Sequence, residues 1–213
     1  MTDEILLGHG SGGRLSNRLI QEVLISAFDN PILNKMDDSA VFDFKGKVAF
    51  TTDNYVVSPI FFPGGDIGKL AVCGTVNDLS MNGARPLYLS NALIIEEGLS
   101  INDLKIIVAS MKEAALEAGI KIVTGDVKVV NRGKADKIFI NTSGIGMIPE
   151  AVNISSSNAK PEDTIILSGP IGDHGMTIMT QREGLSMVGN LQSDCAPLNH
   201  LVADMLTVSK KIH

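Results

Sequence analysis

Four short acidic motifs are the residues of this sequence best suited to chemistry. They contain Asp37 with Asp38, Asp53, Asp78 and Asp126, each at an expected strand end or helix turn. Carboxylates gathered from separate elements repel one another unless a cation neutralises them, and hard oxygen ligands favour Mg²⁺ over softer metals. Each aspartate taken alone is more simply explained as the cap of a turn or helix. Their joint occurrence with a glycine-rich loop favours a shared Mg²⁺ site.

The glycine-rich loop spans residues 9–13 and reads His-Gly-Ser-Gly-Gly. Apolar residues recur at helical spacing between positions 15 and 28, so the loop is expected to lead into a helix that ends before Pro31. Backbone N–H groups without large side chains at a helix start can hold a triphosphate. The spacing matches neither the Walker type nor the dinucleotide fingerprint, and such loops are common in ordinary turns. By itself the loop is a weak signal for nucleotide binding.

The bulk composition excludes several classes of protein. The 213 residues can form one sizeable core and a smaller second unit, and 24 acidic against 18 basic residues give a net charge of −6. Without a basic stripe, nucleic acid is not an expected partner. The acidic N-terminus and the lack of a long apolar run predict neither a signal peptide nor a membrane span. Two cysteines without a CxxC pair suit a reducing cytoplasm, which is the expected location.

The hydrophobic pattern predicts a mixed α+β chain. Strands are expected at residues 39–44 and 48–52, joined by a hairpin turn at 45–47, and at 86–95, 120–123 and 137–148. Helices are expected at 66–81 and 101–118, and Gly68 and Gly74 in the first of these indicate close packing or ligand approach. Residues 1–154 would form an N-terminal domain and the polar residues 155–163 a linker. Residues 164–213, with a strand at 164–167 and a helix from about 172 and another near the end, would be an incomplete second domain.

Taken together, six motifs resemble the HypE family of hydrogenase maturation enzymes. They are His9-Gly10-Ser11-Gly12-Gly13, TDNYVVSP at 52–59, FFPGGDIGKL at 61–70, Val76-Asn77-Asp78, TGDVKVV at 124–130 and GDHG at 172–175. The resemblance covers essentially the whole chain, in order. The motifs at 61–70 and 124–130 separate this family from its relatives aminoimidazole ribonucleotide synthetase, selenophosphate synthetase and thiamine monophosphate kinase.

The resemblance implies a fold and an activity. The fold would be an α+β N-terminal domain of the aminoimidazole ribonucleotide synthetase type, whose strands pair with those of a second subunit in a dimeric β-barrel with ATP near the interface. A C-terminal α/β domain would follow. The enzyme would be a carbamoyl dehydratase that uses ATP to convert an S-carboxamide on a C-terminal cysteine to thiocyanate, which supplies cyanide ligands for [NiFe]-hydrogenase. Its partners would be a HypF-type carbamoyltransferase and the HypC–HypD complex.

The resemblance also implies roles for individual residues. Asp38, Asp53 and Asp78 would hold Mg²⁺, with Asp37 and Asp126 as weaker candidates. The nucleotide would be contacted by Gly10, Ser11, Gly12, Gly13, Asn77, Gly125 and Asp126. Lys128 would stabilise negative charge on phosphate or position the carbamoyl group, although outside this motif it would be read as a solvated strand lysine. His9 either donates to phosphate or orders the loop, and we favour the ordering role.

Three further residues have simpler interpretations. Cys73 is expected in the core and Cys195 at the surface, while His174 either supports a loop or makes a contact across the domain interface. Neither cysteine occupies a C-terminal tail, so this polypeptide alone is expected not to turn over a carbamoyl group, even if it binds ATP. The alternatives are a non-catalytic dimerisation and docking fragment, or a related ATP-dependent synthetase such as selenophosphate synthetase.

Overall fold

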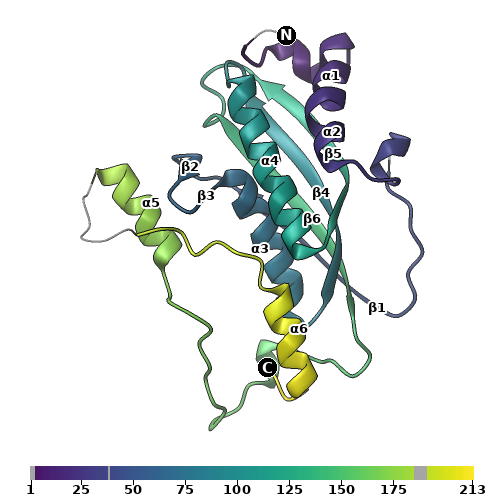
Figure 1. The fold of residues 1–213 in the computed structure, drawn as a ribbon, viewed down its shortest axis with the longest axis vertical. Helices are drawn as coiled ribbons and strands as arrows, with labels where there is room; N and C mark the ends of the chain where they lie inside the picture. Colours follow the sequence, from purple (N-terminus) through teal and green to yellow (C-terminus); the bar gives the residue numbers. More distant parts are fainter. Residues whose placement is uncertain (1–2, 38, 185–190) are drawn as a thin grey trace.

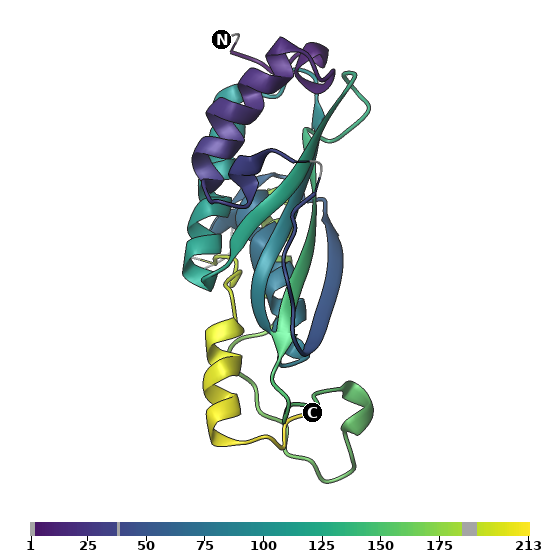
Figure 2. The same cartoon turned by 90° about the vertical axis from the view of Figure 1, so that its right-hand side faces the viewer.

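The computed structural model describes residues 3–37, 39–184 and 191–213, which form a mixed sheet covered by helices on one face (Figures 1 and 2). The N-terminal helical elements are η1 Leu7–Gly10, α1 Arg14–Leu19, the π-helical η2 Ile20–Ile25, α2 Ser26–Phe28 and η3 Leu33–Lys35. The strands are β1 Lys47–Tyr55, β2 Phe61–Phe62, β3 Gly65–Asp66, β4 Arg85–Glu96, β5 Lys121–Val130 and β6 Ile138–Ile148. The other helices are α3 Ile67–Met81, α4 Ile101–Ala118, η4 Ser156–Asn158, α5 Asp173–Glu183 and α6 Asn199–Val208.

The main sheet has four strands in the order β1-β6-β4-β5. β6 pairs antiparallel with both β1 and β4, whereas β4 and β5 are parallel and are connected through α4. A parallel pair needs such a crossover because the chain must return to the same end of the sheet. The mixed α+β class predicted from the sequence is confirmed.

Local capping signals explain why α3 and α4 begin and end where they do. Asp66 accepts hydrogen bonds from the N–H groups of Gly68 at 2.7 Å and Lys69 at 3.0 Å. Ser100 caps α4 in the same way, and Gly119 ends it in the left-handed conformation with φ 69°. The bounds of α4 agree with the prediction, and those of α3 differ by one residue.

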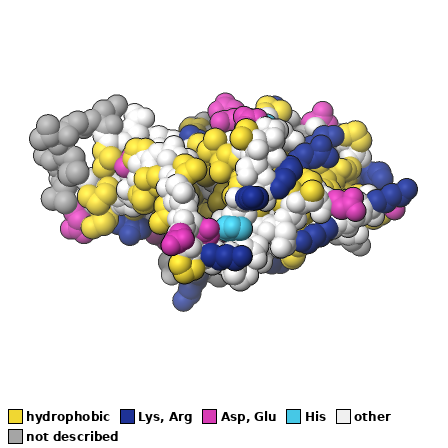
Figure 3. Space-filling view, turned by 90° about the horizontal axis from the view of Figure 1, so that it is seen from below, with side chains coloured by type: hydrophobic (Ala, Val, Ile, Leu, Met, Phe, Trp, Pro, Cys, Tyr) yellow, Lys and Arg dark blue, Asp and Glu magenta, His cyan; other side chains and the backbone are white. Residues whose placement is uncertain are grey.

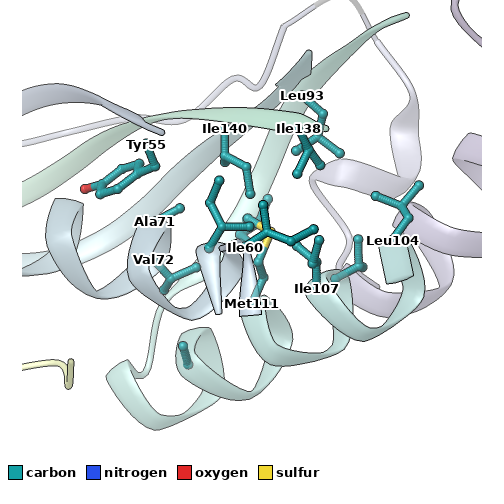
Figure 4. Close-up of a cluster of buried hydrophobic side chains, with 14 of the residues drawn as sticks. Tyr55, Ile60, Ala71, Val72, Leu93, Leu104, Ile107, Met111, Ile138 and Ile140 are labelled. Atoms are coloured by element: carbon teal, nitrogen blue, oxygen red, sulfur yellow. The ribbon is translucent and has the colours of Figure 1, made fainter. Parts of the chain in front are cut away.

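The core lies between the sheet and the layer formed by α3 and α4 (Figure 4). Figure 4 shows Ile107 and Met111 from α4 in the same cluster as Ile138 and Ile140 from β6, and all four are at most 1% exposed. A Cβ atom on Gly68 would lie 2.5 Å from the Ile107 carbonyl oxygen, and one on Gly74 would overlap Tyr55. Close packing is therefore the reason for both helical glycines.

Two predicted strands are wrong. Residues 39–44 form no strand, because Phe42 instead stacks its ring on Tyr88 of β4, with centroids 4.6 Å apart and planes inclined by 10°. Residues 164–167 also form no strand, and Ile165 and Ile166 are 93% and 81% exposed. A strand needs a partner to pair its backbone groups, and the described residues offer none at either place.

The prediction for β5 is too short. The strand continues beyond residue 123 to Val130, so Gly125, Asp126 and Lys128 lie within it rather than beyond its end. Backbone pairing with β4, in the register Asn91 to Gly125 and Ala92 to Asp126, stabilises this extension. Because β4 lies about 30 residues earlier in the chain, the hydrophobic pattern around residue 123 does not indicate this pairing.

The C-terminal segment contains the two predicted helices as α5 and α6 (Figure 1). Seen from below, side chains of both charge signs are interspersed with hydrophobic ones (Figure 3). None of the helices within the described ranges has the length and hydropathy needed to cross a bilayer.

Candidate functional site

The glycine-rich loop is closed by its own hydrogen bonds. His9 is 3% exposed, and its Nδ1 atom accepts a hydrogen bond of 2.9 Å from the Leu6 N–H. Ser16 at the start of the following helix accepts a bond of 2.9 Å from the Gly12 N–H. Gly12 has φ 78°, which a residue with a side chain rarely adopts. These contacts favour the interpretation that His9 orders the loop.

The loop lies directly against β5. A Cβ atom on Gly10 would be 2.5 Å from the backbone nitrogen of Val129, so only glycine allows this approach. Between the loop, the N-terminal helical segment and β5 lies a cavity of about 430 Å³. Its polar lining includes the predicted site residues His9, Gly10, Ser11, Gly12, Asp37, Gly125, Asp126 and Lys128. The fold therefore brings the glycine loop and the 124–130 motif together around one cavity, and Gly13 stands outside its lining.

A second group of predicted residues meets between β1 and α3. Thr51 donates a hydrogen bond of 3.1 Å to the carboxylate of Asp78. Burial raises the pKa of the nearby Tyr55 hydroxyl well above its usual range, and the negative charges of Asp53 and Asp78 raise it further. The charges of both carboxylates thus reach the same hydroxyl.

These two groups lie at opposite edges of the sheet. β1 carries Asp53 and β5 carries Asp126, and three strand spacings, about 14 Å, separate the two strands. Within residues 3–37, 39–184 and 191–213 no three His, Cys, Asp or Glu side chains are placed to hold a metal ion together. Asp38 lies outside the described residues.

Asp53 and Asp78 nevertheless fit a Mg²⁺ site. Mg²⁺ is commonly held by one or two protein carboxylates and completed by phosphate oxygens and water. Their oxygen atoms are hard ligands, and both carboxylates act electrostatically on the Tyr55 hydroxyl, in agreement with that requirement.

Asn77 forms a clamp on the C-terminal segment. Its Nδ2 atom donates to the Ala196 carbonyl at 3.0 Å, and its Oδ1 atom accepts from the Leu198 N–H at 2.7 Å. Both polar atoms of the side chain are therefore engaged, and its contact with nucleotide stays a prediction.

The same segment explains His174 and Cys195. His174 is hydrogen-bonded to the Ser193 hydroxyl at 3.0 Å, as expected for loop support, and it also meets the ring of Phe62 in β2 edge-on, as expected for a contact between the two predicted units. Cys73 is 1% exposed, as predicted for a core residue. Cys195 is half-buried against it rather than a surface thiol, and a hydrogen bond between the two raises the pKa of Cys73 and lowers that of Cys195.

The sequence analysis missed Asn91, which lines the cavity from β4. Asn91 is 4% exposed, and its Oδ1 atom has no hydrogen-bond partner in the structure. A buried, unpaired amide oxygen costs about 1–3 kcal/mol of stability. The available signal was a polar Ser-Asn pair inside an otherwise apolar strand, because buried polar residues are the informative exceptions.

The chain is similar to several known proteins. Residues 36–148 match the model of the family "AIR synthase related protein, N-terminal domain". The chain is 50% identical to carbamoyl dehydratase HypE of Cupriavidus necator over 204 residues, which are 95% of this chain and 58% of that protein. It also resembles the crystal structure of hydrogenase maturation protein HypE in complex with ATP, with a TM-score of 0.92 and 55% identity, covering 94% of this chain and 60% of that one.

The crystal structure of a HypE–HypF complex is similar as well, with a TM-score of 0.76, 56% identity and coverage of 90% of this chain and 62% of that one. The chain thus spans about 60% of the length of the relatives it matches. The chain belongs to the AIR synthase related protein family, and over nearly its whole length it is similar to the HypE proteins.

Proposed function

We propose that this chain is the ATP- and Mg²⁺-binding portion of a HypE-type carbamoyl dehydratase acting in [NiFe]-hydrogenase maturation. The observation that carries the proposal is its similarity, at 55% identity and a TM-score of 0.92, to a HypE structure with ATP bound. The joint placement of the glycine loop, Asp126 and Lys128 around one cavity supports it.

The proposed reaction requires activation of a poor leaving group. ATP supplies a phosphoryl group to the oxygen of the S-carboxamide, so that this oxygen can leave as phosphate while a base removes the nitrogen protons and thiocyanate forms. Asp53 and Asp78 are the proposed Mg²⁺ ligands, with Asp37 and Asp38 as further candidates. Lys128, exposed on β5 at the cavity wall, places a positive charge where phosphate oxygens gain negative charge.

The proposed assembly is a homodimer formed through the face of the sheet that the helices leave open. Val48, Phe50 and Ile94 are 41%, 69% and 44% exposed, which is high for large hydrophobic side chains on strands. Among the residues that the structure describes, β1 pairs only with β6, which leaves its other edge to pair with another strand. The proposed partners are a HypF-type carbamoyltransferase, in line with the similar HypE–HypF complex, and HypC–HypD.

The proposal keeps the division into residues 1–154, a linker at 155–163 and a second unit from 164. Two observations support it. The family match ends at residue 148, and Ile165, Ile166, Leu167 and Ile171 are between 64% and 93% exposed. Such an exposed apolar run is typical of a surface that packs against another segment or partner.

Calorimetry with ATP and Mg²⁺ tests the nucleotide site. We expect the unsubstituted chain to bind ATP and Asp78→Asn to bind it about tenfold or more weakly. Mutation of a residue that only supports a metal ligand already lowers metal affinity by about 10- to 100-fold, so loss of a ligand itself should cost at least as much. Asp204→Asn, an exposed aspartate on α6, is the matched control and should bind normally. If the unsubstituted chain does not bind ATP, the non-catalytic docking alternative is favoured.

A further inference from the structure

The two cysteines of the sequence meet where the segment at 193–198 packs on α3. Cys73 of α3 is 1% exposed, and Cys195 packs half-buried against the same hydrophobic core. Their thiol groups are hydrogen-bonded to each other. The two residues are more than a hundred positions apart in the sequence, so only the fold brings them together.

The segment at 193–198 is attached near α3 at two places, one on either side of Cys195. Just before the helix, the Ser193 N–H donates to the Pro63 carbonyl oxygen at 2.8 Å. Near the other end of the helix, the Asn77 side chain bonds to the backbone at both 196 and 198. These bonds involve neither thiol, so they hold Cys195 in place independently of its own chemistry.

Cys73 lies between the same two attachment points along the helix. It follows Pro63 and precedes Asn77 by four residues. Side chains four residues apart in a helix lie on the same face, with Cβ atoms about 5–6 Å apart. The face of α3 that binds the segment through Asn77 therefore also presents Cys73 to Cys195.

The two thiols differ in access and in acidity. Cys195 is the more exposed of the pair, and Cys73 is enclosed behind it. The hydrogen bond from Cys73 lowers the pKa of the Cys195 thiol, and the positive charge of Lys69 lowers it further, against the opposing effect of burial. The same hydrogen bond and burial raise the pKa of Cys73. Cys195 is therefore the thiol that ionises first and meets a reagent first.

We propose that Cys73 and Cys195 form a redox-modification site whose oxidant is a low-molecular-weight disulfide such as glutathione disulfide, and that their disulfide fastens the segment at 193–198 to α3. The Cys195 thiolate attacks one sulfur of glutathione disulfide, which gives a mixed disulfide and one glutathione thiolate. The Cys73 sulfur then attacks the Cys195 sulfur, and the second glutathione leaves with the proton of Cys73. Two protein thiols are oxidised and one reagent disulfide is reduced to two thiols, so the electrons balance.

The fastened state would keep the Asn77 side chain engaged with the segment. In a reducing compartment the pair stays as thiols, and transient disulfides there usually serve redox sensing. No step of this exchange involves nucleotide, so its failure and the failure of the proposed function are separate results.

A redox titration tests the site in the original chain. The reduced chain is equilibrated with mixtures of reduced and oxidised glutathione, acid-quenched and analysed by intact mass and peptide mapping. We expect the folded chain to lose two hydrogen atoms without retaining glutathione. A disulfide typically favours the folded over the unfolded state by about 30- to 1000-fold, and by reciprocity its equilibrium constant should be larger by that factor in buffer than in denaturing urea.

Single-cysteine variants test the order of attack. Cys73→Ala should stop at the mixed disulfide of Cys195 with glutathione, because the second thiol is missing. Cys195→Ser should leave Cys73 unmodified while the chain is folded, because Cys73 is 1% exposed. Circular dichroism of each variant verifies that it is folded under the conditions of the reaction.

Hydrogen exchange tests the fastening itself. The N–H groups of Ser193 and Leu198 are both hydrogen-bonded across this contact, and in the oxidised chain they should exchange about tenfold or more slowly than in the reduced chain. The amides of residues 131–137, which take no part in the contact, are the matched control and should be unchanged.

Four results would overturn the proposal. They are a folded original chain that carries glutathione adducts without an internal disulfide, a disulfide that joins two chains, an equilibrium constant no larger in buffer than in urea, and unchanged exchange of Ser193 and Leu198 on oxidation.

Discussion

Replacing Gly68 with alanine changes the free energy of unfolding through two opposing effects, helix propensity and side-chain packing. In an isolated helix the change would stabilise α3 by about 1 kcal/mol, because alanine loses less backbone entropy than glycine. Within this fold, the new methyl group would point at α4, where Gly68 is fully covered. The sign of the effect on the free energy of unfolding therefore shows which of the two dominates.

The structure gives the magnitude. The new Cβ atom would lie 2.5 Å from the Ile107 carbonyl oxygen, 2.8 Å from Met111 Cγ and 2.9 Å from Ile107 Cγ2. Because the closest atom belongs to the backbone of α4, the two helices must separate rather than rotate one side chain. Overpacking costs about 1–3 kcal/mol, and these contacts place Gly68 at the upper end. After subtracting the propensity gain, we expect a net loss of about 2 kcal/mol and a fall in Tm of about 4–8 °C.

Urea unfolding followed by circular dichroism, with thermal unfolding beside it, measures both quantities. Gly175→Ala in α5 is the matched control, because a Cβ atom there meets no other group within 4 Å. That variant should show no loss and a gain of up to about 1 kcal/mol. The packing argument is refuted if Gly68→Ala is as stable as the original chain, or if both variants lose stability equally.

Two further predictions concern titrating groups. Cys195 has a lowered pKa and is half-buried, whereas Cys73 has a raised pKa and is buried. Iodoacetamide should therefore alkylate Cys195 first. Equal alkylation rates of the two cysteines in peptide mapping would contradict this prediction. The pKa of Glu96 is lowered by hydrogen bonds from the N–H groups of Gly133 and Lys137, so its contribution to holding this loop is present above its unfolded pKa and is lost as pH falls through its folded value. After correction for the intrinsic pH dependence of hydrogen exchange, the amides of residues 131–137 should lose protection on acidification. The Glu96→Gln variant should show a smaller loss. The same pH profile in both proteins would rule out Glu96 as the cause of the lost protection.

Long helices were predictable because their signals are local. The apolar spacing of residues 101–118, the cap at Ser100 and the stop at Gly119 lie within one stretch of chain, and the structure reproduces those bounds. The glycine loop leading into a helix was predictable for the same reason. The six motifs also sufficed to indicate the similarity to the HypE proteins, and the chain belongs to the AIR synthase related protein family.

Site geometry was less accessible to pattern analysis. The sequence proposed the glycine loop and the 124–130 motif as parts of one site, and the structure places both at one cavity. The sequence gives no sign that about 14 Å of sheet separates β5 from β1, or that Asn77 is occupied by the segment at 196–198. Those facts depend on strand order and on chain segments more than a hundred residues apart.

By itself, the sequence determined which residues are available for chemistry and which stretches form helices, because side-chain type and helical periodicity are properties of neighbouring residues. Only the tertiary structure decided three further points. Residues 39–44 form no strand, and Phe42 stacks on Tyr88 instead; β5 extends to Val130; and the buried Oδ1 atom of Asn91 has no hydrogen-bond partner. Each of these depends on whether a distant backbone or side chain is present to satisfy a polar group or cover an apolar one, and local sequence does not contain that information.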